Sequence, residues 1–131
     1  MRIVLVNWAK IWDGASNGGG VNGYCLALAL ALRDRGHEVI SFFGGVTYMP
    51  SPLSPPGDTR CQVRRHEDWL GIKVFEVVNS PVIAPSIAQF QDPLGEVSSP
   101  ELERVATEFF AAAKADIVHF HNVEGFSAGC V

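Results

Sequence analysis

Glycine is concentrated near the start of the chain, in a stretch that could bind an anion. Residues 13–23 read Asp-Gly-Ala-Ser-Asn-Gly-Gly-Gly-Val-Asn-Gly, between an apolar run, residues 3–6, and an alanine- and leucine-rich run, residues 24–32. Glycine accepts positive φ and lets a ligand approach the backbone closely. A strand, a glycine-rich loop and a helix in this order would aim free N–H groups and the positive end of a helix dipole at one point, which favours phosphate. The alternative interpretation is a flexible loop before a glycine-rich helix start.

Two histidines occupy a second apolar run, residues 116–121, with the sequence Asp-Ile-Val-His-Phe-His. Because successive side chains of a strand point to opposite faces, His119 and His121 would share one face. Two such histidines could bind a metal ion together, but no third ligand is evident, and zinc sites usually have a fuller set. We therefore expect no metal, and we interpret His119 as a buried core histidine whose hydrogen bonds are satisfied.

Two tryptophans, Trp8 and Trp12, follow the first apolar run among polar residues. Ligands of open α/β sheets bind outside the carboxyl ends of the strands, so this segment suits a ligand cleft. The alternative is that the indoles cover the edge of the sheet. The residue types leave both interpretations open.

The elements that would position these residues begin with a strand, a helix and a second strand. Residues 2–6 are apolar and β-branched, which predicts a strand buried on both faces. A helix is expected from about residue 21 to residue 35, with Gly36 as its C′ residue. Its apolar face would comprise Val21, Cys25, Leu28 and Leu32. Residues 38–43 would then complete a βαβ unit with a right-handed crossover.

The middle of the chain predicts a hairpin followed by a helix. Residues 61–67 and 72–78 are strand-like runs, which favour a hairpin or a strand pair at the edge of the sheet. Ser99 as N-cap and Pro100 at the first helical position mark the clearest helix start. The apolar stripe of this helix would be formed by Leu102, Val105, Ala106, Phe109, Phe110 and Ala113.

The remaining segments complete an α/β domain. Residues 116–121 are expected to form a further buried strand, residues 126–131 to open another helix, and residues 47–57, with four prolines, to form an exposed loop. Together these elements predict one domain over residues 1–131, with a mostly parallel, Rossmann-like sheet and helices on both faces. Because the chain stops soon after its last strand, we expect a truncated domain that belongs to a longer protein. It could self-associate through an open sheet edge.

The composition narrows the class of protein. A net charge of −4 without a basic patch argues against nucleic acid as a partner. Cys25, Cys61 and Cys130 are widely spaced and odd in number, which indicates no disulfide framework and favours a reduced, intracellular setting. Residues 1–6 contain no secretory signal, and the longest apolar run, residues 24–32, falls well short of the roughly 20 residues that span a bilayer. We expect a soluble, cytoplasmic protein that could work peripherally at a membrane.

Four segments, taken in order, carry a resemblance to a known family. They are the strand over residues 1–6, Gly-Gly-Gly-Val-Asn-Gly-Tyr over residues 18–24, Arg-Gly-His-Glu-Val over residues 35–39, and the run over residues 116–121. Together they resemble the N-terminal, acceptor-side domain of family 4 retaining glycosyltransferases, which have the GT-B fold. The resemblance covers both ends of the chain and does not extend to its proline-rich middle.

This resemblance implies an enzyme that transfers a sugar from a nucleotide-sugar donor to a hydroxyl of a sugar or lipid acceptor, with retention and without a metal or other cofactor. His121 matches the family's histidine at the end of the later strand, and as a catalytic residue it would hydrogen-bond and orient the transferred sugar. The donor phosphates would lie near Gly18, Gly19 and Gly20. Acceptor contacts are assigned to Trp8, Trp12 and Asn22, because these residues flank the mouth of the expected cleft.

The chain also departs from the family's pattern. Most donor contacts in this family come from a C-terminal domain with a Glu-x7-Glu pair, and no two glutamates of this sequence have that spacing. The resemblance therefore implies that the C-terminal nucleotide-sugar domain is missing from residues 1–131. We expect this chain alone to be inactive as a transferase.

Two alternative functions remain from the residues themselves. Gly18, Gly20 and Gly23 match the G-x-G-x-x-G fingerprint of dinucleotide-binding Rossmann domains. However, the first of these glycines lies well past the strand, and residues 41–45 contain no acidic side chain for the ribose hydroxyls. The other alternative is a flavodoxin-like interaction module without chemistry, which a fold alone does not exclude.

Overall fold

The chain forms a five-stranded sheet. The structure is a computed structural model that describes residues 1–44, 60–82, 98–123 and 125–131. The side chains of residues 17 and 18 are not among the described parts. The strands are β1 (Arg2–Asn7), β2 (Glu38–Gly44), β3 (Gln62–Arg65), β4 (Lys73–Val78) and β5 (Ile117–Phe120). Their order in the sheet is β3-β4-β2-β1-β5. All neighbouring pairs are parallel except β3 and β4, which are antiparallel. The predicted hairpin and the mostly parallel, Rossmann-like α/β class are both confirmed.

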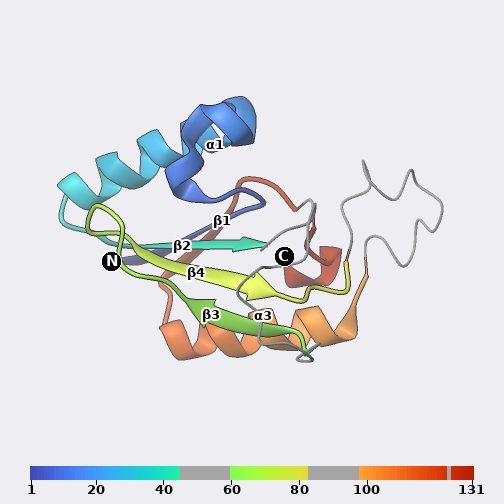
Figure 1. The fold of residues 1–131 in the computed structure, drawn as a ribbon. Coiled ribbons are helices and arrows are strands. Elements are labelled where there is room, and N and C mark those ends of the chain that lie inside the picture. The colour runs from blue at the N-terminus through green and yellow to red at the C-terminus, as the bar shows by residue number, and fades with distance from the viewer. Residues whose placement is uncertain (45–59, 83–97, 124) are drawn as a thin grey trace.

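Helices cover both faces of the sheet, as the sequence predicts. Helix α1 (Gly14–Asp34) lies over one face and α3 (Pro100–Ala113) over the other (Figure 1). Each helix closes its own hydrophobic core. Cys25 and Ala29 of α1 pack on the core that contains Leu5 and Phe43, while α3 packs on the core that contains Phe42. Two short 3-10 turns, η1 (Ile11–Asp13) and η2 (Ala128–Cys130), complete the described elements.

Helix α1 begins earlier than predicted, and it contains a break. The expected loop is helical from Gly14, and the helix is interrupted only at Gly19, whose φ of 60° and ψ of −161° are not helical. The first segment packs back against the second, because a Cβ at Gly23 would lie only 3.2 Å from that of Ala15. Glycine at position 23 therefore permits the close approach, and glycine at position 19 supplies the positive φ that the reversal needs.

The apolar face of α1 is also rotated relative to the prediction. Val21 is 41% exposed, while Asn22, Cys25 and Ala29 are buried. These three positions are spaced by three and four residues, and Val21 lies about 100° around the helix from Asn22. The predicted end of the helix is confirmed, because Gly36 has φ +81° and its N–H donates to the Arg33 carbonyl at 2.8 Å.

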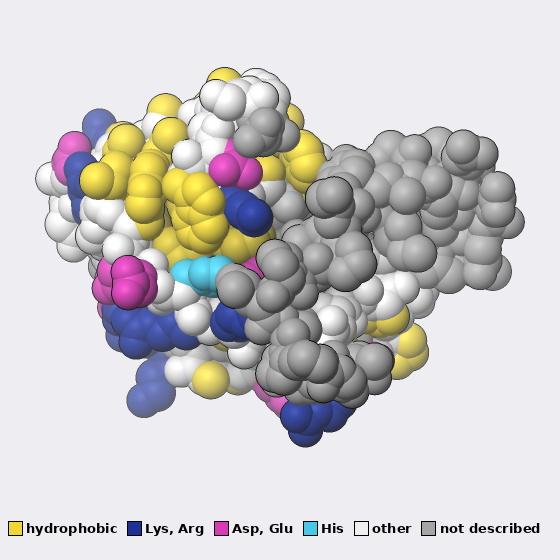
Figure 2. Space-filling view, viewed as in Figure 1, with side chains coloured by type: hydrophobic (Ala, Val, Ile, Leu, Met, Phe, Trp, Pro, Cys, Tyr) yellow, Lys and Arg dark blue, Asp and Glu magenta, His cyan; other side chains and the backbone are white. Residues whose placement is uncertain are grey.

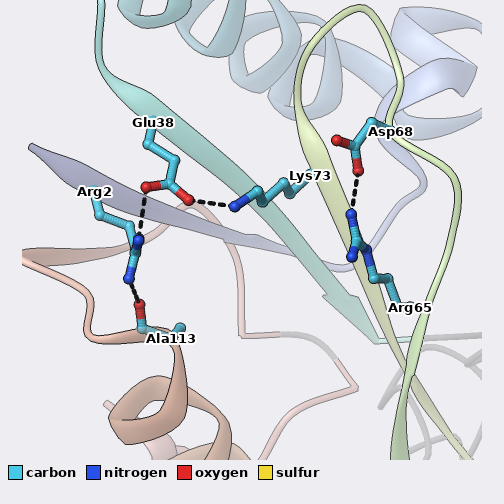
Figure 3. Close-up of polar contacts among 6 residues, drawn as sticks. All are labelled: Arg2, Glu38, Arg65, Asp68, Lys73 and Ala113. Carbon is cyan, nitrogen blue, oxygen red and sulfur yellow. Dashed lines mark hydrogen bonds and ion pairs between the residues drawn. The ribbon is translucent and has the colours of Figure 1, made fainter.

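Helix α3 follows its prediction closely. The Ser99 side chain accepts a hydrogen bond from the Leu102 N–H at 3.3 Å, as an N-cap should. Phe109 stacks on Phe42 of β2, with ring centroids 4.4 Å apart. At the other end of the sheet, Arg2 donates to the carbonyl of Ala113 at 2.5 Å and pairs with Glu38, which also pairs with Lys73 (Figure 3). These contacts join α3 to the amino ends of three strands.

The last part of the chain corrects three predictions. Strand β5 is not buried: it ends the sheet, its only neighbour among the described strands is β1, and Ile117 is 43% exposed. His119 is therefore exposed rather than a satisfied core histidine. Residues 126–131 form only the short turn η2 instead of a helix. The predicted loop over residues 47–57 falls entirely among residues that are not described.

No helix among the described residues is long and apolar enough to cross a membrane. The longest of them, α1, is broken at Gly19 and carries Arg33 in its last turn.

Candidate functional site

One row of side chains crosses the sheet near the carboxyl ends of its parallel strands, on the face that α1 covers. The strand register places Phe43 between Asn7 and Glu76, and it pairs Glu76 with Arg64 of β3. At the other end of the row, the N–H of His121 donates to the Val6 carbonyl at 2.9 Å. Four polar side chains from four different segments therefore lie along the edge where α/β sheets bind ligands.

Asn22, which the sequence assigns to an acceptor contact, is instead fully buried inside this edge. Its Oδ1 accepts from Asn7 Nδ2 at 2.8 Å, and its Nδ2 donates to the carbonyls of Lys10 and Gly14 at 2.9 and 2.7 Å. These bonds satisfy the amide group and hold the segment between β1 and α1 in place. Asn22 therefore positions the site, and its amide is engaged within the chain.

His121 presents a ring nitrogen that has no partner among the described residues. Its Nε2 is buried and unbonded, and its ring stacks on that of His119 with centroids 4.2 Å apart. Burial lowers the pKa of His121 below its ordinary 6.5, and the charge of His119 lowers it further. The ring is therefore neutral at pH 7, and a ligand hydroxyl would have to reach below the surface to form a hydrogen bond with Nε2.

The glycine stretch meets His121 through one aromatic side chain. Tyr24 of α1 lies edge-on to His121, with centroids 5.6 Å apart. Gly20 is one helical turn before Tyr24, so it lies on the same side of α1. A Cβ added at Gly19 or at Gly20 would meet nothing within 4 Å, which means that the backbone is open there. The surroundings of Gly18 are outside the described residues.

The two tryptophans have different environments. Trp8 is half-buried, and its backbone N–H donates a hydrogen bond to Asn7 Oδ1 at 2.9 Å. Trp12, in η1, is 36% exposed and packs edge-on against the rings of Phe43 and His66, at 5.8 and 5.5 Å. Trp12 therefore lies toward β4 and β3, whereas the glycines and His121 lie toward β5.

Sequence reasoning missed a buried ion pair beneath Trp12. Glu76 is only 3% exposed, and one of its oxygens lies 2.6 Å from His66 Nε2 and 3.8 Å from an Arg64 nitrogen. The sequence indicates this carboxylate, because positions 72, 74, 76 and 78 share one face of the strand and only Glu76 among them is charged. A single carboxylate in an apolar row must find a partner, since an unpaired buried charge is costly.

Residues 14–18 also match the G-x-S-x-G pattern of hydrolase nucleophile elbows, with Ser16 at its centre. In those enzymes the serine lies on a sharp turn directly after a strand. Here Ser16 is exposed within the first segment of α1, and the hydrogen bonds among the described residues do not join it to a histidine. The match therefore has no geometric support as a catalytic nucleophile.

Within the described part of the chain, no group of three or more histidine, cysteine, aspartate or glutamate side chains is placed to hold a metal ion. The paired histidines on β5 and the His66–Glu76 pair each fall short of such a set.

Comparisons with models of protein families, with curated proteins and with solved structures found no match for this chain. The resemblance to family 4 glycosyltransferases therefore stays an expectation from the sequence. What the chain could do must be judged from the geometry of its carboxyl edge.

Proposed function

We propose that this chain forms one wall of a glycosyltransferase, which moves a sugar from a nucleotide-sugar donor to an acceptor hydroxyl with retention. The observation that carries the proposal is the contact between Tyr24 and His121, which joins the start of the second segment of α1 to the end of β5. It makes neighbours of the two groups that the sequence assigns to the donor: the open backbone at Gly19 and Gly20, and the imidazole of His121.

The glycines would admit the donor's diphosphate. A helix that starts after a break presents N–H groups that lack partners within the helix, together with the positive end of its dipole. With no side chain at Gly19 or Gly20, an anionic oxygen could come within hydrogen-bonding distance of this backbone. These groups would stabilise the negative charge that develops on the leaving diphosphate, so that the proposal requires no metal or other cofactor.

His121 would bind and orient the sugar that is transferred. The lowered pKa keeps its ring neutral, and the free Nε2 can accept from or donate to a sugar hydroxyl according to its tautomer. Holding the sugar in one orientation against the incoming hydroxyl would supply much of the rate enhancement. The acceptor would be a sugar or a lipid, and we infer a cytoplasmic setting, peripheral to a membrane in the second case.

A further domain would complete the enzyme. The proposal assigns the grip on the nucleotide to a C-terminal domain with a Glu-x7-Glu pair, a spacing that these 131 residues do not contain. Residues 1–131 should then bind a donor only weakly and should not transfer sugar by themselves. Activity is expected only where both walls of the cleft are present.

A binding measurement on the 131-residue chain tests the proposal. We would titrate the ¹⁵N-labelled chain with UDP, GDP and ADP, with their glucose conjugates, and with NAD. At least one nucleotide-sugar should shift the amide signals of residues 19–23 and the ring signals of His121. Gly20→Val should abolish these shifts, because its branched side chain would fill the open space. Ala27→Val introduces the same branched side chain at an exposed position of α1 and is the matched control.

Two results would count against the proposal. One is that no nucleotide-sugar shifts the signals of residues 19–23. The other is that NAD shifts them and the sugar conjugates do not, which would favour the dinucleotide-binding alternative.

A further inference from the structure

The buried His66–Glu76 pair lies well away from the donor site just proposed. Its glutamate belongs to β4, and β2 and β1 separate that strand from β5 and His121. Glu76 accepts a hydrogen bond from His66 Nε2 at 2.6 Å. This bond uses Nε2 of the ring, so Nδ1 is the nitrogen that the contact with Glu76 leaves to other groups. Nothing in the proposed donor chemistry uses this pair.

An exposed aromatic side chain adjoins the pair. Trp12 packs on His66 with centroids 5.5 Å apart, and both rings contact Phe43, so that two aromatic side chains flank the imidazole. Trp12 keeps 36% of its surface exposed, and the His66 side chain keeps 19%. On the face drawn in Figure 2, histidine atoms reach the surface beside hydrophobic side chains. An apolar ring therefore lies next to an oriented hydrogen-bonding group.

From this geometry we propose that Trp12, His66 and Glu76 form a subsite for a pyranose ring of a sugar acceptor. The C–H face of the sugar would pack against the indole of Trp12, and a ring hydroxyl would form a hydrogen bond with Nδ1 of His66. Glu76 would act as a positioning residue, because its hydrogen bond to Nε2 fixes the orientation of the imidazole. The chemistry matches that of small-molecule sites, which combine apolar walls with a few placed polar groups.

A purely structural role explains the pair less well. A buried ion pair is weak evidence for stability, because the cost of removing both charges from water can exceed their attraction. The other residues on this face of β4, Val74 and Val78, are apolar and fully buried, so another apolar side chain would suit position 76 for packing alone. A carboxylate here has a clear purpose if it orients a histidine toward a ligand.

The subsite rests on the proposed transferase, since it names the class of acceptor. The two inferences can nevertheless fail separately. Donor binding is read from the amides of residues 19–23 and the ring of His121. Acceptor binding is read from the indole N–H of Trp12 and the ring of His66.

The test is a titration of the labelled 131-residue chain with methyl α-glucoside, methyl α-galactoside and methyl α-mannoside. At least one glycoside should shift the signals of Trp12 and His66. The substitution His66→Phe keeps a ring in place but removes both nitrogens, and it should weaken this binding about tenfold. Because His66→Phe leaves Arg64, 3.8 Å away, as the remaining partner of buried Glu76, the double variant His66→Phe/Glu76→Met is measured as well, since it removes both polar groups together.

The control is Trp69→Phe, which changes another tryptophan that packs on the α1-side core. It should bind the glycosides as the parent chain does. The subsite is supported if a glycoside shifts the Trp12 and His66 signals and the double variant loses this response, even where no nucleotide-sugar binds at residues 19–23. It is overturned if none of the three glycosides shifts those signals, or if the folded double variant binds as tightly as the parent.

Discussion

At the scale of single residues, the protonation of His121 depends on two neighbouring effects. Burial is the larger cause of its lowered pKa, and the charge of His119 is the smaller. The substitution His119→Gln should therefore raise the pKa of His121 but leave it below 6.5, because burial remains. Titration of the ring signals by NMR would measure this change.

The direction of the effect has a consequence for stability. A histidine with a lowered folded pKa prefers to be neutral, so the folded state loses stability as the pH falls from 6.5 through the folded pKa of His121. The control is His37→Gln, which makes the same change next to the amino end of β2 and should leave the pKa of His121 as it is in the parent chain. A pKa of His121 above 6.5 in the parent chain, or no change in His119→Gln, would contradict this account.

Single residues were predicted unevenly from the sequence. Strand alternation predicts that His119 and His121 lie on one face, and the structure confirms this prediction, because their rings stack. The exposure of His119 could not be predicted, because it depends on which strand ends the sheet. Asn22 is assigned to an acceptor contact because it flanks the mouth of the expected cleft, and only the three-dimensional placement of Asn7 shows why its amide is buried.

At the scale of elements, the break in α1 has two glycines with different requirements. Gly19 needs a positive φ, whereas Gly20 has no such requirement and has open space for a Cβ. We expect Gly19→Ala to destabilise the fold by about 1–2 kcal/mol through backbone strain. The change Gly20→Ala should be neutral or stabilise the fold by up to about 1 kcal/mol, because alanine favours the helix. Urea unfolding of the three proteins would measure both effects.

This contrast also separates folding from binding. If Gly20→Ala is as stable as the parent but binds nucleotide-sugars less well, the open backbone serves a ligand rather than the fold. Equal destabilisation by both substitutions would show instead that the break needs glycine at both positions for structural reasons.

Elements with a complete local signal were the ones that the sequence located well. Helix α3 has its N-cap, its proline and its stripe, and it begins where these predict. The start of α1 was missed, because the five glycines and two asparagines of residues 14–23 favour a loop by intrinsic propensity, and only the packing of Ala15 on Gly23 overrides it. The buried character assigned to residues 116–121 failed because apolarity does not reveal the place of a strand in the sheet.

At the scale of the whole molecule, the two cores on opposite faces of the sheet each contain a buried thiol. Cys25 belongs to the core under α1, and Cys61 to the core under α3. Burial raises the pKa of each from 9.0 to about 11, and for Cys61 the charge of Glu101 contributes as well. In the unfolded chain both thiols ionise near pH 9.0, whereas in the folded chain they stay protonated until about pH 11.

The folded state should therefore lose stability as the pH rises from 9 toward 11, since ionised thiols favour the unfolded chain. Urea unfolding under reducing conditions at pH 8, 9 and 10 would measure this loss, and the double variant Cys25→Ala/Cys61→Ala should lose less over the same interval. Each single variant should remove part of the difference, because the thiols lie in separate cores and act independently. Equal alkaline losses in the parent and the double variant would mean that other groups destabilise the fold, and that both thiols are more open to water than their burial indicates.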